Sequence, residues 1–130
     1  MKMVTFHANC VTTLDMDDFW LVGFADQEQS PKQYFMLQRG YEDDEQDVAL
    51  GMNTYYAERD NQGWSGYGGI KRFELNRNSI RVIFTAEGCN QFETEGMKIT
   101  FQSDEHQFSR LGDRLEKIFK GSDCFFMRGK

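Results

Sequence analysis

The residue types that do chemistry in proteins are scattered along this chain without the spacings that catalysis or metal binding requires. Its two histidines, His7 and His106, lie far apart, and neither stands in an HExxH or cysteine-rich context. The chain also has no GxSxG, P-loop or GxGxxG motif. Glu74 and Glu87, or Asp43 and Glu58, could pair in space as an acid and a base, but spacing alone does not bring carboxylates together. We predict that the protein is not an enzyme and holds no metal or cofactor.

The three cysteines, Cys10, Cys89 and Cys124, are an odd number and form no CxxC pair. This pattern is more typical of a reducing compartment than of a disulfide framework. The N-terminus has no long apolar run, and no apolar stretch reaches the ~18 residues that a membrane span needs. We expect a cytoplasmic protein without a disulfide and without a membrane partner.

The negative charge lies in the first half of the chain. Residues 1–65 carry 4 basic and 12 acidic side chains, whereas residues 66–130 carry 11 and 9, which gives the net charge of −6. Binding to nucleic acid requires clustered Lys and Arg, so this distribution argues against a nucleic-acid partner. It favours a basic protein partner, or none.

The acidic run at residues 42–47 and the aromatic side chains that follow it are the candidate partner-binding site. We hypothesise that the contact is made by Asp43, Asp44, Glu45, Asp47, Tyr55, Tyr56, Trp64 and Tyr67. Neighbouring residues of a strand point to opposite faces, so only one of Tyr55 and Tyr56 can meet a partner while the other enters the core. The alternative is that the run is only a solvated face.

Strands must position these residues. Runs at residues 52–59, 66–75 and 79–84 alternate with turns at 60–63 and 76–78, which predicts a β-meander. Gly68 and Gly69 within the second run indicate a bulge, a bend or a close backbone approach, and a bulge is the favoured interpretation. Four further strands and a short final one are expected at residues 4–11, 19–25, 34–37, 97–102 and 124–127.

Two segments of the chain indicate how the sheet and the helix pack on each other. Residues 19–25 are apolar toward both faces, which is typical of a central strand covered on both sides. Residues 104–120 have apolar side chains at helical spacing, and their acidic start and basic end match the helix dipole, which predicts a helix. At residues 85–95 we expect a turn or an irregular connection. The predicted fold is α+β: a single domain over residues 1–130, with an antiparallel β-sheet, a meander of about six to eight strands, and one C-terminal amphipathic α-helix packed on a face.

The central stretch resembles the tenth family of immunity proteins from bacterial polymorphic toxin systems. The resemblance rests on Asp44-Glu45-Gln46-Asp47, Leu50-Gly51-Met52, Tyr55 and Tyr67-Gly68-Gly69-Ile70, followed by an alternating strand and a terminal helix. It covers the middle of the chain and, more loosely, the C-terminal half. It implies a small cytosolic bacterial protein that binds a cognate toxin domain and neutralises it.

The activity of the toxin and the oligomeric state stay open at this point. Nuclease toxins have basic clefts for phosphate that an acidic inhibitor could occupy, and a nuclease is our extrapolation from that. The alternative is a small-molecule-binding or enzymatic α+β domain with a pocket between sheet and helix. A filled, dry core would count against this alternative, whereas a pocket of several hundred cubic ångströms with converging polar groups would favour it.

Overall fold

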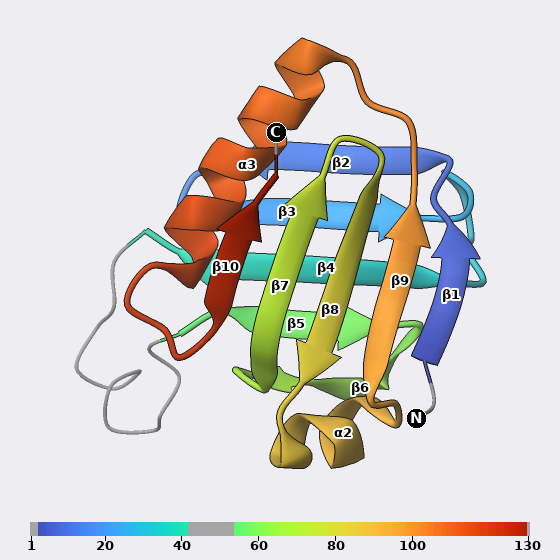
Figure 1. The fold of residues 1–130 in the computed structure, drawn as a ribbon, viewed down its shortest axis with the longest axis vertical. Helices are drawn as coiled ribbons and strands as arrows, with labels where there is room; N and C mark the ends of the chain where they lie inside the picture. Colours follow the sequence, from blue (N-terminus) through green and yellow to red (C-terminus); the bar gives the residue numbers. More distant parts are fainter. Residues whose placement is uncertain (1–2, 42–53, 130) are drawn as a thin grey trace.

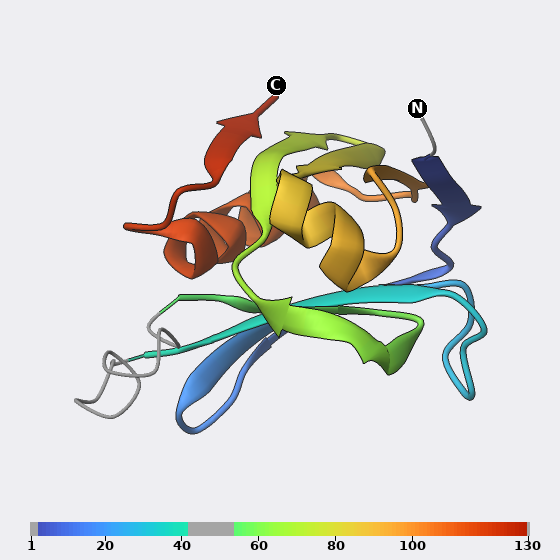
Figure 2. The same ribbon diagram turned by 90° about the horizontal axis from the view of Figure 1, so that it is seen from below.

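The computed structural model describes residues 3–41 and 54–129. Ten strands in this part of the chain form two five-stranded sheets, and two helices accompany them. The strands of one sheet run across those of the other in Figure 1, and Figure 2 shows the sheets as two facing layers. The α+β class is confirmed. The single sheet of about six to eight strands is corrected to two sheets.

Sheet A has the order β1 (Met3–His7), β9 (Gly96–Thr100), β8 (Ser79–Phe84), β7 (Ile70–Asn76) and β10 (Phe125–Arg128). Its three central strands pair antiparallel, while β1 and β10 add parallel to β9 and β7 at the edges. The hairpin between β7 and β8 and the short last strand are confirmed. The purely antiparallel sheet was wrong because β1 and β10, the first and last strands of the chain, pair with strands that neither precede nor follow them directly, so no tight turn has to reverse the chain between them.

Sheet B is a meander in chain order: β2 (Cys10–Asp15), β3 (Phe19–Ala25), β4 (Tyr34–Gly40), β5 (Tyr56–Arg59) and β6 (Asn61–Tyr67). All four pairings are antiparallel. A meander therefore exists, but the one predicted over residues 52–84 is divided: β5 and β6 are the last two strands of sheet B, whereas β7 and β8 lie in sheet A. The turn predicted at residues 60–63 is corrected as well, because β6 already begins at Asn61.

The chain passes between the sheets at corners that interrupt two predicted strands. The run at residues 4–11 divides into β1 and β2, and the run at 66–75 divides at Gly68 and Gly69, whose φ angles are 74° and 93°. Glycine adopts this left-handed conformation without steric cost, which a sharp corner needs. The inner faces of both sheets meet one core, so the alternation of apolar residues continues across a corner and hides it from the sequence.

A single apolar core lies between the sheets. Alternation directs one side of every strand into it, and its largest fully buried side chains are Phe24, Phe35, Phe73, Phe92, Phe101, Leu37, Ile70, Leu75, Ile80, Met97, Ile99 and Tyr55. Burial of such apolar surface is the main favourable contribution to folding. The core therefore fixes which face of each sheet remains outside.

Helix α3 (Glu105–Phe119) confirms the predicted C-terminal helix. Asp104 caps it, because its side chain accepts a hydrogen bond from the Gln107 amide while the Gln107 side chain accepts one from the Asp104 amide. Its apolar stripe contacts β2, β3 and β4 of sheet B, and β10 of sheet A lies against it too. In Figure 2 the helix lies between the two layers. It fills the side of the core that the sheets leave open.

Helix α2 (Ala86–Phe92) corrects the irregular connection predicted for residues 85–95, and with it the expectation of one helix. Thr85 caps it, since its Oγ1 accepts a hydrogen bond from the Gly88 amide at 3.0 Å. Gly88 is a poor helix former, which weakened the signal. A Cβ at Gly88 would lie 2.1 Å from the Gly69 carbonyl oxygen, so the close approach of the glycine corner requires this residue.

Candidate partner-binding surface

The outer face of sheet B is the side of its strands turned away from the core. Val22, Phe24, Phe35, Leu37 and Ala57 point inward and are buried. The strand register therefore directs a second set outward: Cys10, Thr12, Leu14, Phe19, Leu21, Gly23, Ala25, Tyr34, Met36, Gln38, Gly40, Tyr56, Glu58, Ser65 and Tyr67. We call this set the outer face. Apolar and aromatic side chains make up most of it.

This face explains why residues 19–25 are apolar toward both sides. The expectation that both sides of this strand are covered is corrected. β3 is an interior strand as predicted, and α3 packs on its inner side. Within the described part of the chain no helix or strand lies over its outer side (Figure 2). Leu21 and Gly23 are half-buried there, and Leu14 on the neighbouring strand is exposed. An apolar surface left uncovered in this way is typical of an interaction site.

Tyr56 and Tyr67 lie side by side on the outer face. They are register partners of β5 and β6, with ring centroids 5.4 Å apart in an edge-to-face arrangement. Tyr67 is 43% exposed although it is a large aromatic residue. Of the four aromatic residues hypothesised to bind a partner, these two are the ones that the structure brings together on an open surface.

Tyr55 instead lies in the core, 2% exposed, with its ring 5.0 Å from that of Phe119. Its hydroxyl accepts a hydrogen bond from the Ile70 amide at 2.8 Å. Burial raises the pKa of this hydroxyl well above its ordinary value. The opposite directions expected of Tyr55 and Tyr56 are thus assigned: Tyr55 inward and Tyr56 outward.

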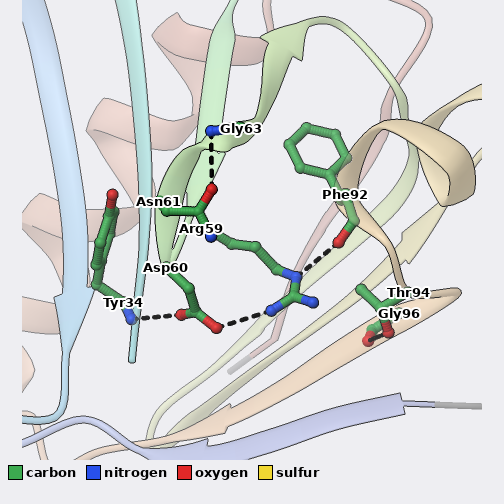
Figure 3. Close-up of polar contacts among 8 residues, drawn as sticks. All are labelled: Tyr34, Arg59, Asp60, Asn61, Gly63, Phe92, Thr94 and Gly96. Atoms are coloured by element: carbon green, nitrogen blue, oxygen red, sulfur yellow. Dashed lines mark hydrogen bonds and ion pairs between the residues drawn. The ribbon is translucent and has the colours of Figure 1, made fainter. Parts of the chain in front are cut away.

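Trp64 covers a buried arginine. Its ring lies 4.1 Å from the guanidinium carbon of Arg59, and alternation along β6 turns it to the side opposite Ser65. Arg59 donates to the Phe92 carbonyl and to the Asp60 carboxylate, both at 2.7 Å, and Asp60 accepts from the Tyr34 amide at 2.9 Å (Figure 3). Trp64 therefore has a place in the fold that sequence reasoning did not foresee.

The four acidic candidates, Asp43, Asp44, Glu45 and Asp47, lie outside the described residues. Their segment joins β4 to β5, which are neighbours in sheet B. At its near end Tyr41 packs on Trp20, with ring centroids 4.6 Å apart, and donates its hydroxyl to the Met16 carbonyl. Tyr41 therefore lies beside the exposed β2–β3 turn.

That turn adds acidic side chains which sequence reasoning left out of the site. Asp17 and Asp18 are exposed in it, and Asp15 at its start pairs with Arg114, at 2.5 Å and 2.7 Å. The hydrogen bond from Arg114 lowers the pKa of the Asp15 carboxyl. The β2–β3 turn therefore places acidic side chains beside Tyr41, the residue that precedes the acidic run in the sequence.

A cavity of about 510 Å³ at the glycine corner bears on the alternative function. It is bordered by Thr54, Tyr67 and Gly69, by α2 and by the chain after α3. Gln91 lines it, and its buried Nε2 has no hydrogen-bond partner among the described residues. Other polar groups there are engaged: the Thr85 hydroxyl caps α2 and the Tyr55 hydroxyl bonds Ile70.

Neither a metal-binding cluster nor a membrane-spanning helix is found in the part of the chain that the structure describes. Residues 3–41 and 54–129 contain no group of three or more His, Cys, Asp or Glu side chains placed to hold a metal ion. None of their helices is long and apolar enough to cross a membrane. Cys10, Cys89 and Cys124 are free and partly buried.

The comparison with known proteins agrees with the resemblance found in the sequence. A sequence model described as Immunity protein 10 matches residues 7–109. The match includes strands near the N-terminus that the motif resemblance did not cover. No curated protein matches the chain. Since the matched span is most of the 130 residues, the chain belongs to the immunity protein 10 family.

Proposed function

We propose that the protein binds a cognate bacterial toxin domain in the cytoplasm and neutralises it without chemistry of its own. Membership of the immunity protein 10 family is the observation that carries the proposal. The absence of a catalytic motif from the sequence is in keeping with an inhibitor that acts by occupation.

The contact is proposed to combine the acidic residues 42–47 with Tyr56 and Tyr67. Exposed charges act mainly on the rate of encounter, whereas aromatic side chains that become desolvated contribute most of the affinity. The two tyrosines support this role because they form one exposed aromatic patch on an uncovered sheet face. A toxin with a basic cleft, such as a nuclease, would complement the acidic residues, and we extend the proposal to that class.

A pull-down with the protein encoded immediately upstream tests the proposal, because immunity genes usually neighbour their toxins. We expect a stoichiometric complex with nanomolar Kd and loss of the toxin's activity in it. Absence of binding to the neighbouring toxin domain, with both proteins folded, would contradict the proposal.

The cavity at the glycine corner supports the second candidate, a small-molecule-binding domain. Its volume of about 510 Å³ lies within the range of ligand pockets, and the Gln91 side chain lines it. A thermal-shift screen of metabolites separates the two candidates. A ligand that stabilises the wild type and loses its effect in Gln91→Leu would favour the pocket, whereas no shift together with toxin binding would favour the immunity function.

A further inference from the structure

The outer face of sheet B is hollowed at its middle. A shallow cavity of about 290 Å³ lies over β2, β3 and β4, and Thr12, Leu21, Gly23, Tyr34 and Met36 line it. It exists because Gly23 has no side chain: a Cβ there would meet only Leu21 and Thr12, at 3.9 Å and 4.0 Å, which are ordinary contacts. The hollow could accept an apolar side chain of a partner.

A buried carboxylate lies beside this hollow. Glu58 is the register partner of Met36 and is 8% exposed, although its strand position faces outward. Tyr34 donates its hydroxyl to Oε2, and Tyr56 donates to Oε1 at 2.7 Å. A carboxylate has about four acceptor positions, so two hydroxyl donors leave the other positions open.

No cation accompanies Glu58 in the described part of the chain. Other carboxylates there pair with arginine: Asp60 with Arg59, Glu74 with Arg72, Asp15 with Arg114, and both Asp113 and Glu116 with Arg128. Glu58 is the most deeply buried of the carboxylates named here, and tyrosine hydroxyls are its only partners among residues 3–41 and 54–129. A buried charge without an opposite charge is costly to a fold, so such a group points to a role outside stability.

We propose that this face binds the toxin through an arginine that pairs with Glu58 while neighbouring apolar side chains enter the hollow. The inference rests on the proposed function and names the partner chemistry of the same surface. A guanidinium can donate two parallel hydrogen bonds to a carboxylate and stack on the Tyr34 and Tyr56 rings. Arginine and aromatic residues are also the side chains that most often dominate the energy of an interface.

The composition of the face excludes two other occupants. The outward residues of sheet B include no Lys, Arg or His, so a second copy of the chain docked face to face would supply no cation to Glu58. Phosphate groups of a nucleic acid would meet a carboxylate within an apolar surface, without any cation to neutralise them. A basic protein surface satisfies both the charge and the hollow.

The first test is Glu58→Gln, which keeps the size and one carbonyl acceptor of the side chain but removes its charge. We expect the Kd for the upstream-encoded toxin domain to rise at least about tenfold, because truncated buried charge pairs lose that much or more. The melting temperature should change little, since no cation in the described fold loses its partner and the tyrosine hydroxyl beside the new NH2 group can accept a hydrogen bond from it. Unchanged affinity in a folded variant would overturn the inference.

The second test fills the hollow with Gly23→Phe. The new ring projects from an interior strand toward solvent, so the variant should fold, while its affinity for the toxin falls at least about tenfold because the ring occupies the partner's place. Thr5→Phe is the matched control, as it adds the same ring to an exposed strand position of sheet A. Equal affinities of the two variants would overturn the proposed location.

The arginine is identified by Arg→Ala variants of the toxin domain in double-mutant cycles with Glu58→Gln. One toxin arginine should lose at least about tenfold in affinity against the wild type and almost nothing against Glu58→Gln. Additive losses at every arginine would overturn the pairing. If the wild type binds no toxin, the proposed function is contradicted as well. If the wild type, Glu58→Gln and Gly23→Phe all bind the toxin equally tightly, only this inference is contradicted.

Discussion

The guanidinium of Arg59 lies beneath the indole ring of Trp64, 4.1 Å from its centroid. From this buried position Arg59 reaches the carbonyl at the end of α2 and, through Asp60, the first residue of β4 (Figure 3). One side chain thus connects sheet B to the helix that packs at the glycine corner. The indole excludes water from these hydrogen bonds, which strengthens them.

Trp64→Ala should therefore lower the free energy of unfolding by roughly 1–3 kcal/mol, from the lost cation–π contact and packing. Urea unfolding measures this, and Trp64→Phe serves as the control because it keeps an aromatic ring over Arg59. Trp64 is also one of the partner contacts predicted from the sequence. If it contacts the toxin, Trp64→Ala should make the toxin dissociate faster. Unchanged stability with faster dissociation would favour that role over the structural one.

Leu115 lies at the centre of the apolar stripe of α3 and is fully buried. Leu115→Ala should cost ~2–5 kcal/mol of unfolding free energy, because the cavity that it leaves between α3 and the sheets can collapse only in part. His106→Ala on the exposed side of the same helix is the control and should change stability little. A loss below about half a kcal/mol would contradict this packing of the helix.

Much of the fold could be predicted because alternation and helical spacing are local signals. β3 has the predicted bounds, and α3 follows the predicted apolar stripe. The division into two sheets could not be predicted in the same way. Gly68 and Gly69 signalled a special backbone, but a bulge and a corner use the same residues, and the choice depends on contacts with α2 that only the assembled fold makes.

The candidate site was predictable in part for a similar reason. Alternation required Tyr55 and Tyr56 to point apart, and only the sheet order determines which one is buried. The apolar residues on both sides of the strand at 19–25 predicted a cover on each side, but the sequence does not say whether a helix or a partner provides it. The burial of Glu58 gave no signal, because it depends on Tyr34, 24 positions earlier in the chain.

The stability of the protein should fall as pH rises above about 10. Burial is the largest cause that raises the pKa of Tyr55 above its ordinary value of 10.0, and burial likewise raises those of Tyr34 and Tyr56. The protonated hydroxyls therefore stabilise the fold fully below the unfolded pKa, and this stabilisation is lost at higher pH, where the unfolded chain releases its protons first.

Tyr55→Phe tests the contribution of the most buried of these hydroxyls. At neutral pH it should cost ~1–3 kcal/mol, because the Ile70 amide loses its acceptor. Above pH 10 its unfolding free energy should fall less steeply than that of the wild type, by up to about 1.4 kcal/mol per pH unit for one proton. Equal slopes in urea titrations from pH 9 to 11 would contradict the burial of this hydroxyl.

Cys124 should be the least reactive thiol of the native protein. Burial raises its pKa to about 12, so almost none of it is thiolate at neutral pH, and the thiolate is the nucleophile. We expect iodoacetamide at pH 8 to label Cys124 only after unfolding, as followed by peptide mass spectrometry. A Cys124→Ser variant that folds identifies the peptide, and rapid labelling in the native state would contradict the prediction.

The acidic run and the tyrosine pair should act on different steps of toxin binding. Reversal of Asp43, Asp44 and Asp47 to Lys should slow association and flatten its salt dependence, because exposed charges steer encounter over long range. The fold should stay intact, since a solvated run contributes little to stability. Tyr67→Ala should instead raise the dissociation rate, because it removes an exposed ring that binding would desolvate.

A matched reversal elsewhere separates a local effect from a change in net charge. Glu87, Glu93 and Glu105 are exposed and lie outside sheet B, so their reversal to Lys changes the charge equally without touching the proposed surface. Stopped-flow association at several salt concentrations, with cell protection as a second readout, compares the two triple variants. If both slow association equally, the effect comes from net charge alone. If the variant at Asp43, Asp44 and Asp47 associates as fast as the wild type and still protects cells, the acidic run is a solvated face and the toxin binds elsewhere.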